Sequence, residues 1–224
     1  GLADAIDLHI NGAVSHFSWR DLPVTLQLAG DHNVRNALAA ALTAEALGRD
    51  SVDIADALCA VDPPRGRFEF VDIGQPFRVA VDYAHTPDAL AAALGAARQV
   101  AGDAKVSVVF GCGGNRDHKK RPVMGRSAVD GADRVFVTSD NPRNENPADI
   151  IDDILGGIPG GATHPGVFVT PSRAEAIAKA ISEAAEGDVV LIAGKGHETE
   201  QVIGDTVMPF DDRRVAIEAI GASR

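Results

Sequence analysis

The sequence has little of what marks a secreted, membrane-spanning or nucleic-acid-binding protein. Its two cysteines, Cys59 and Cys112, lie in distant contexts, which indicates a reducing compartment rather than a disulfide framework. No apolar run approaches the roughly 20 residues that cross a membrane, and no signal peptide is visible. A net charge of −11 argues against a general nucleic-acid surface. We therefore expect a cytoplasmic protein that binds neither membrane nor nucleic acid, and we expect it to be a monomer.

What the sequence does contain is a series of short, valine-rich apolar runs separated by helical patterns. Such runs are typical of parallel strands that are joined by helical crossovers. Because parallel strands end along one edge of their sheet, the polar and glycine-rich residues that follow the runs should meet there. The five runs are residues 77–81, 106–110, 135–139, 167–169 and 189–193.

Helix signals lie between these runs. Pro87, Pro122 and Pro147 each stand where a helix would begin, a position that favours proline. Asp211 precedes the last expected helix, and an edge hairpin is expected at residues 202–207, around a glycine and an aspartate. The predicted fold class is therefore α/β, with a mostly parallel sheet.

The first 65 residues follow a different pattern. Asn11-Gly12 stands between two alternating runs and is typical of a two-residue β-hairpin turn. Two prolines and a glycine make residues 62–66 the best linker candidate. Because 65 residues are too few for an α/β domain, we expect residues 1–65 to be the tail of one domain and residues 66–224 to be another. The expected elements are strands at 6–10, 14–18 and 24–28 and helices at 33–48 and 52–60.

The most informative stretch is Asp140-Asn141-Pro142-Arg143, which follows one of the apolar runs. It offers a carboxylate, an amide, a rigid turn and a guanidinium. This set suits a ligand that carries both an ammonium and a carboxylate, because Asp140 can pair with the first and Arg143 can bind the second with two hydrogen bonds. Taken alone, the stretch is equally consistent with a proline turn and incidental charges. The polar ends of the other runs favour a site.

Six stretches together resemble the Mur ligases, and nearest among them the tripeptide synthetases of peptidoglycan synthesis. They occur in the family's order and span nearly the whole chain, although no single one is specific. Within the family, the Asp-Asn-Pro-Arg loop is associated with meso-diaminopimelate as the added amino acid. The stretches are residues 32–36, 66–69, 82–87, 111–117 with 120–122, 140–143 and 194–198.

The resemblance implies a Rossmann-like carboxy-terminal domain preceded by the tail of a central ATPase domain. It implies a ligase that uses ATP and Mg2+ to join meso-diaminopimelate to UDP-N-acetylmuramoyl-L-alanyl-D-glutamate. No phosphate loop occurs, because Gly194-Lys195-Gly196 lacks the upstream glycine and the following hydroxyl residue. We therefore expect a piece of a longer protein that is inactive alone, with the metal ligands elsewhere and no metal site in this chain.

The resemblance also assigns the amino-acid site. Arg116 and Arg143 would hold the distal carboxylate of diaminopimelate. Lysine lacks that carboxylate and would leave guanidinium charge unpaired, so the pair would exclude lysine. The distal amino group and its surroundings would meet Asp140, Asn141, Gly194 and Glu198, with Pro142 in the same loop.

The nucleotide would meet a second set of residues. Asn36, with Asn33 nearby, would contact adenine, and Arg67 would reach the phosphates. Asp82 would accept hydrogen bonds from the ribose, and His85 would lie near the phosphate end. Each has a structural alternative: Asn33 can cap its helix, Arg67 can form a linker ion pair, and Asp82 and His85 can be turn residues.

Two other functions remain open. One is a non-catalytic amino-acid-binding module of Mur ligase ancestry, which the missing phosphate loop favours for this polypeptide. The other is a different ligase of the same superfamily, such as a folylpolyglutamate synthase. The Asp-Asn-Pro-Arg and Gly-Lys-Gly-His-Glu stretches argue against the latter.

Overall fold

The computed structural model describes residues 4–11 and 14–223, which divide into two compact units, Gly1–Pro64 and Arg65–Arg224. The division falls within the proline- and glycine-containing stretch at residues 62–66. Within the described part of the chain, no helix is long and apolar enough to cross a membrane.

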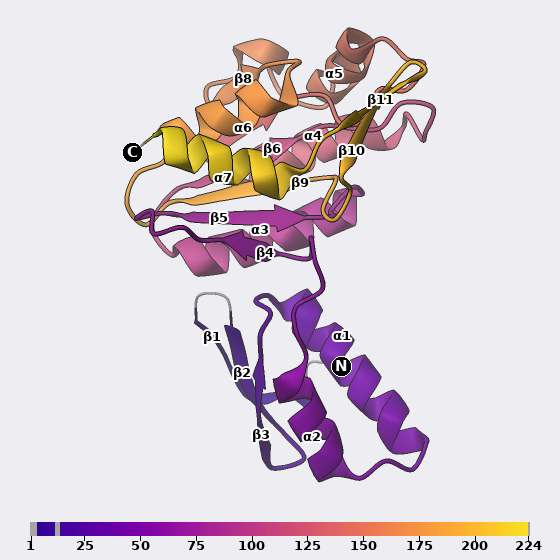
Figure 1. The fold of residues 1–224 in the computed structure, drawn as a ribbon, viewed down its shortest axis with the longest axis vertical. Helices are drawn as coiled ribbons and strands as arrows, with labels where there is room; N and C mark the ends of the chain where they lie inside the picture. The colour runs from indigo at the N-terminus through magenta and orange to yellow at the C-terminus, as the bar shows by residue number, and fades with distance from the viewer. Residues whose placement is uncertain (1–3, 12–13, 224) are drawn as a thin grey trace. The chain divides into compact units, whose positions relative to one another are not determined.

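The first unit is a three-stranded antiparallel sheet followed by two helices (Figure 1). The predicted turn at Asn11-Gly12 falls partly on residues 12–13, which lie outside the described residues. Strand β3 begins at Leu22 rather than at the predicted residue 24, because Arg20 and Asp21 form a tight turn with φ of 53° and 62°. Arg-Asp carries no glycine or asparagine, so the sequence gives no signal for this turn. The elements are β1 (Ile6–Asn11), β2 (Val14–Trp19), β3 (Leu22–Leu26), α1 (Asp31–Ala46) and α2 (Ser51–Ala60).

The core of the first unit lies between the sheet and the two helices. Phe17 and Trp19 point from β2 to one side, and Leu38 of α1 and Ile54 of α2 belong to the same buried cluster. Trp19, the only tryptophan of the chain, is fully buried there. The period of two in β2 therefore gives this small sheet one buried face.

The second unit confirms the predicted α/β class. Its six-stranded sheet has the order β4-β5-β9-β6-β7-β8, and every neighbouring pair is parallel except β4 with β5. The antiparallel edge strand β4 was not predicted. The strands are β4 (Glu69–Val71), β5 (Arg78–Asp82), β6 (Val106–Phe110), β7 (Arg134–Val137), β8 (Val167–Val169) and β9 (Val189–Ala193).

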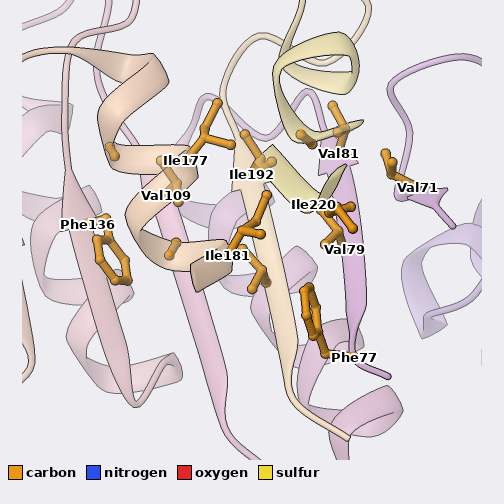
Figure 2. Close-up of a cluster of buried hydrophobic side chains, with 14 residues drawn as sticks. Val71, Phe77, Val79, Val81, Val109, Phe136, Ile177, Ile181, Ile192 and Ile220 are labelled. Atoms are coloured by element: carbon orange, nitrogen blue, oxygen red, sulfur yellow. The ribbon is translucent and has the colours of Figure 1, made fainter. Parts of the chain in front are cut away.

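Helices cover both faces of this sheet (Figure 1). Pro87 and Pro147 begin their helices as predicted, and Pro122 lies in the first turn of its helix. On one face, Ile177 and Ile181 of one helix and Ile220 of another pack on alternate strand residues (Figure 2). The helices are α3 (Pro87–Ala101), α4 (Lys120–Gly131), α5 (Pro147–Leu155), α6 (Arg173–Ser182) and α7 (Asp212–Ala222).

The expected edge hairpin is a hairpin, but it does not lie at the edge of the main sheet. Strands β10 (Glu200–Ile203) and β11 (Thr206–Pro209) form a separate two-stranded sheet. The outer side of β10 instead bonds to the 140–143 loop: Arg143 N donates to Val202 O at 3.0 Å, and Gly204 N donates to Arg143 O at 2.7 Å. The predicted position at the edge of the main sheet was therefore wrong. The backbone groups of the hairpin that could pair with that sheet bond to the loop of Arg143 instead.

A buried ion pair fastens α6 and α7 to the end of the main sheet. Arg173 donates to both carboxylate oxygens of Asp212 at 2.7 Å and to Ala193 O at 2.9 Å, and both charged side chains are fully buried. The pair thus joins the first turns of two helices to the last residue of β9.

We expect Arg173→Met to destabilise the second unit by about 3–5 kcal/mol, because it leaves the Asp212 carboxylate buried without its partner. Urea denaturation followed by circular dichroism measures this loss. Arg214→Met is the matched control, because Arg214 pairs with Glu218 at 3.0 Å on the surface of α7. That exposed pair should contribute less than about 1 kcal/mol. Equal losses in the two variants would contradict the importance of the buried pair.

Candidate functional site

Three loops meet at the carboxyl edge of the main sheet. They follow β6, β7 and β9, which are neighbours in the sheet, and they span residues 111–117, 138–146 and 194–198. The parallel arrangement therefore brings together the strand ends that the sequence singled out. The predicted amino-acid residues all lie in these loops.

The loop after β6 lies directly against the loop after β7. Gly114 N donates to Asn141 O at 2.9 Å, and Nη1 of Arg143 donates to Gly114 O at 2.8 Å. A Cβ atom on Gly114 would lie 1.8 Å from Pro142 O, so only glycine allows this approach. The contact fixes the backbone from which the Arg143 side chain extends.

Both predicted carboxylate-binding arginines border one glycine. A Cβ atom on Gly113 would lie 2.9 Å from Nη1 of Arg143 and 3.7 Å from Cγ of Arg116. Arg116 is exposed and Arg143 is half-buried. The structure therefore brings the two guanidinium-bearing side chains to the same place, as a shared carboxylate ligand requires.

Arg121 holds the two loops in register. It is 1% exposed, and it bonds Glu145 at 2.9 Å, Asp153 at 2.9 Å and Gly113 O at 3.3 Å. Glu145 also accepts a hydrogen bond from the Asn115 amide. Arg121 therefore supports the loop of Arg116 from inside and is not part of a solvated basic surface.

Asp140 does not face solvent. It is 7% exposed, and Gly194 lies so close that an added Cβ would be 2.7 Å from Oδ2 of Asp140. Burial raises the pKa of Asp140, although the positive charges of Arg173 and Lys195 oppose the rise. Burial thus opposes the charged form of Asp140, whereas the pairing predicted from the sequence needs a carboxylate. That pairing stays a prediction.

Asn141, Lys195 and Glu198 form a buried polar triangle. Oδ1 of Asn141 accepts from Nζ of Lys195 at 3.2 Å, and Nδ2 of Asn141 donates to Oε2 of Glu198 at 2.8 Å. Lys195 closes the triangle by donating to Oε2 of Glu198 at 3.2 Å. Asn141 and Glu198 were predicted site residues. Lys195 was not, although a lysine between two glycines after a buried strand is a signal.

Hairpin strand β10 completes the wall of the site. Val202 N donates to Oδ1 of Asn141 at 3.0 Å, and Nε2 of Gln201 donates to Asp140 O at 2.7 Å. Neither contact could be predicted from the sequence, because a backbone group is one partner in each.

The predicted phosphate-binding residues of the second unit gather around Tyr83. The Arg67 guanidinium lies 5.0 Å from the centroid of the Tyr83 ring, and the rings of His85 and His197 lie 4.6 and 5.1 Å from it. Arg67, His85 and His197 are exposed. The structure therefore places positively charged or protonatable groups around one aromatic ring, where an anionic ligand can reach them.

Asp82 lies beside this group but is buried. Its Oδ2 accepts from Phe68 N and its Oδ1 accepts from Ala84 N, both at 2.7 Å. These bonds hold the turn at Phe68, where φ is 48°, and so position Arg67 next to it. Asp82 thus has the role of a turn residue in this structure, and its contact with ribose stays a prediction.

The predicted adenine-binding residues belong to the first unit. Asn33 is buried, and its Nδ2 donates to Ala29 O at 2.8 Å, which ties α1 to the segment that precedes it. Asn33 therefore does not cap α1, whose N-cap is Gly30, and its contact with adenine stays a prediction. Asn36 is exposed on α1. Among the described residues, no group of three His, Cys, Asp or Glu side chains could hold a metal ion.

The sequence is similar to a known family and to named enzymes. Residues 66–196 match the family model described as "Mur ligase, glutamate ligase domain". The UDP-N-acetylmuramoyl-L-alanyl-D-glutamate–2,6-diaminopimelate ligase of Geobacillus thermodenitrificans is 52% identical over 204 residues, which are 91% of this chain and 41% of the relative. The ligase of the same name from Solibacter usitatus is 48% identical over 193 residues, which are 86% of this chain and 38% of the relative.

Solved structures agree with this similarity. A structure of a UDP-N-acetylmuramoyl-L-alanyl-D-glutamate–2,6-diaminopimelate ligase superposes with a TM-score of 0.70 at 36% identity, over 97% of this chain and 45% of that one. The UDP-N-acetylmuramate-alanine ligase of Thermotoga maritima shares the fold, with a TM-score of 0.65 at 21% identity over 98% of this chain and 46% of that one. The chain thus spans about two fifths of the length of the curated relatives it matches.

Two carboxyl groups of the site should affect stability in opposite directions as the pH changes. Burial raises the pKa of Asp140, so folding becomes less favourable as the pH rises above its ordinary value of 3.8. Burial alone would also raise the pKa of Glu145, but hydrogen bonds from the Asn115 amide and Arg121 outweigh it and lower that pKa. The stabilisation from Glu145 is therefore complete above its ordinary value of 4.5 and is lost as the pH falls through the lower folded value.

We therefore expect Asp140→Asn to raise the urea midpoint and Glu145→Gln to lower it at neutral pH. Both differences from the unsubstituted chain should shrink towards acidic pH. Urea titrations from about pH 2.5 to pH 7 measure them, because the Glu145 contribution is lost only below its ordinary value of 4.5, and each variant serves as the control for the other. Differences of the same sign in the two variants would contradict the opposite shifts.

Proposed function

Because the chain belongs to the Mur ligase family, we propose that it holds meso-diaminopimelate for a ligase that forms an amide bond with UDP-N-acetylmuramoyl-L-alanyl-D-glutamate. The observation that carries the proposal is the meeting of Arg116, Arg143, Asn141 and Glu198 at one sheet edge. Donors and a carboxylate stand side by side there, as a desolvated zwitterion requires. The names of the similar ligases support diaminopimelate as the amino acid.

The hydrogen bonds favour a specific division of the ligand's charges. Nη1 of Arg143 already bonds Gly114 O, so the other guanidinium N–H groups are the donors left for a carboxylate. Arg116 lies beside it with an exposed side chain. Glu198, half-buried at the other end of the site, supplies the carboxylate that pairs with the ammonium. Asp140 is buried against Gly194, so it would support that loop rather than pair directly with the ligand.

The proposed reaction needs the amine close to an activated carboxyl group. The family resemblance implies that ATP phosphorylates the dipeptide carboxylate, which gives an acyl phosphate and ADP. The diaminopimelate amine then attacks the acyl carbon, loses a proton and releases phosphate. This chain's contribution is orientation, since a bound amine reacts far faster than a free one.

The proposed ATP contacts in this chain are Arg67, His85 and Asp82, with Asn33 and Asn36 in the first unit. Arg67 and His85 share the Tyr83 ring, and the positive charge of Arg67 suits the phosphates. The ligands for Mg2+ and most of the site for the UDP-linked dipeptide would lie in parts of the relatives that this chain does not match. We place the protein in the cytoplasm as a monomer.

A second function follows from one absence in the sequence. No Gly-x-x-Gly-Lys-Thr/Ser phosphate loop occurs in these residues. A polypeptide of this sequence alone would therefore bind the amino acid without joining it to anything. Isothermal titration of meso-diaminopimelate into the chain tests binding, and ADP release with both substrates present tests ligation.

We expect Arg143→Ala, in a ligase that contains this chain, to reduce the specificity constant for meso-diaminopimelate about 30- to 4,000-fold. We expect this loss because the distal carboxylate of the bound diaminopimelate would lose its bidentate hydrogen bonds to the guanidinium. The constant for lysine should fall little or rise, since lysine lacks that carboxylate. Steady-state kinetics with both amino acids measure the ratio. Arg126→Ala is the control, because Arg126 pairs with Asp130 on the exposed side of α4. An equal loss for both amino acids would mean that Arg143 only supports its loop.

We expect Arg67→Ala to impair ATP use and to leave stability nearly unchanged, because the guanidinium is exposed and, among the described residues, contacts the Tyr83 ring without an ion pair. In the same ligase, the Michaelis constant for ATP should rise while the melting temperature stays within a few degrees. Arg65→Ala is the neighbouring control, because Arg65 forms an exposed ion pair with Asp211 at 2.6 Å. Normal ATP kinetics with a large loss of stability would show that Arg67 is structural.

A further inference from the structure

We propose that Lys195 is a positioning residue that decides which atoms of Asn141 and Glu198 face the incoming amino acid. The inference rests on the proposed function, because Lys195 would orient the donor and the acceptor groups of the proposed amino-acid site. Lys195 lies in the loop after β9, and its side chain is fully buried.

The ammonium of Lys195 has no donor left for a ligand. A lysine carries three N–H donors. Nζ lies 3.2 Å from Oδ1 of Asn141, 3.2 Å from Oε2 of Glu198 and 2.5 Å from Glu200 O. These three acceptors belong to three segments: the loop after β7, the loop of Lys195 itself and the first residue of the hairpin. Lys195 is therefore saturated by the protein and can act on a ligand only through its neighbours.

The first consequence concerns the orientation of the Asn141 amide. Its Oδ1 accepts from two donors, Nζ of Lys195 and Val202 N at 3.0 Å. If the amide turned over, its NH2 group would face these two donors and could not accept from them. The oxygen must therefore point towards Lys195 and Val202. Only Nδ2 remains, and one of its two hydrogens goes to Oε2 of Glu198. Asn141 can therefore offer a ligand one donor and no acceptor.

The second consequence concerns Glu198. Its Oε2 accepts from Lys195 at 3.2 Å and from Asn141 at 2.8 Å. The other oxygen, Oε1, accepts no hydrogen bond from any side chain or backbone group within the described residues. The side chain is 34% exposed, so Oε1 can be reached. A fixed donor and a fixed carboxylate oxygen thus stand side by side, and they match the carboxylate and the ammonium of one amino-acid head.

The alternative is that Lys195 only stabilises the fold. Lys195→Met removes only one partner of the pair with Glu198. Glu198 is 34% exposed, so water can solvate the carboxylate that is left, and the loss of stability should be smaller than for the fully buried pair of Arg173 and Asp212. Stability and ligand affinity therefore distinguish the two roles. If Lys195 positions the site, an uncharged side chain of the same length should spare folding, release the Asn141 amide and weaken binding.

The test is calorimetric titration of meso-diaminopimelate into the chain of residues 1–224, unsubstituted and with Lys195→Met. We expect the dissociation constant to rise about 10- to 100-fold. We also expect the preference for meso-diaminopimelate over lysine to decrease, because a freely turning amide no longer reads the carboxylate. Lys179→Met is the matched control: Lys179 pairs with Glu183 at 2.7 Å on α6, outside the three loops, and its removal should leave both constants unchanged.

A second measurement does not depend on how the variant folds. In the unsubstituted chain, the side-chain NH2 of Asn141 should show two separate NMR signals, one of them protected from exchange with water by Glu198. Addition of meso-diaminopimelate should shift the other. Rapid exchange of both hydrogens in the unsubstituted chain would overturn the inference.

The outcomes separate the inference from the proposed function. Weaker binding to Lys195→Met, with a urea midpoint near that of the unsubstituted chain, supports both. Binding that is as tight as in the unsubstituted chain overturns the role of Lys195 and leaves the proposed function standing. Failure of the unsubstituted chain to bind meso-diaminopimelate, with a protected Asn141 amide, overturns the proposed function and the substrate assigned to the triangle.

Discussion

The buried ion pair of Arg173 and Asp212 is the interaction on which the site depends. It fixes the starts of α6 and α7 and also holds Ala193 O at the last residue of β9. The loop that carries Lys195 and Glu198 leaves the sheet at the next residue. Because α6 and α7 also cover one face of the sheet, the same pair couples the hydrophobic core to the polar edge. Movement of either helix would therefore displace the site.

Positive and negative side chains are paired at this edge of the sheet, and the pairing lets charged groups be buried there. Asp212 is balanced by Arg173, and Lys195 is balanced by Glu198. Among the described residues, no hydrogen bond or ion pair reaches the Asp140 carboxylate, and burial raises its pKa. Networks of this kind stabilise a unique arrangement when every member is satisfied and cost free energy when one is not. Asp140 is thus the member whose presence a purely structural account does not explain, as is common at functional sites.

The sequence predicts much of this architecture, because valine-rich buried strands and proline-started helices carry strong local signals. It also predicts that the loops containing Arg116, Asp140 and Glu198 meet, since parallel strands end on one edge. It does not predict the attachment of β10 to the Asp140 loop. That attachment uses backbone groups and Gln201, about 60 residues away in sequence. The triangle around Lys195 is hidden for the same reason: its geometry depends on contacts between distant segments.

The proposed phosphate-binding and amino-acid-binding groups are joined by close backbone packing. A Cβ atom on Gly66 would lie 2.2 Å from His197 N, and one on Gly196 would lie 2.6 Å from Cβ of Tyr83. Arg67, next to Gly66, stacks on Tyr83, while Gly196 follows Lys195. The residues around Tyr83 and the triangle of Asn141, Lys195 and Glu198 are therefore linked through close backbone contacts. Such close packing suits the proposed reaction, in which the amine would have to stay within reach of an activated carboxyl group.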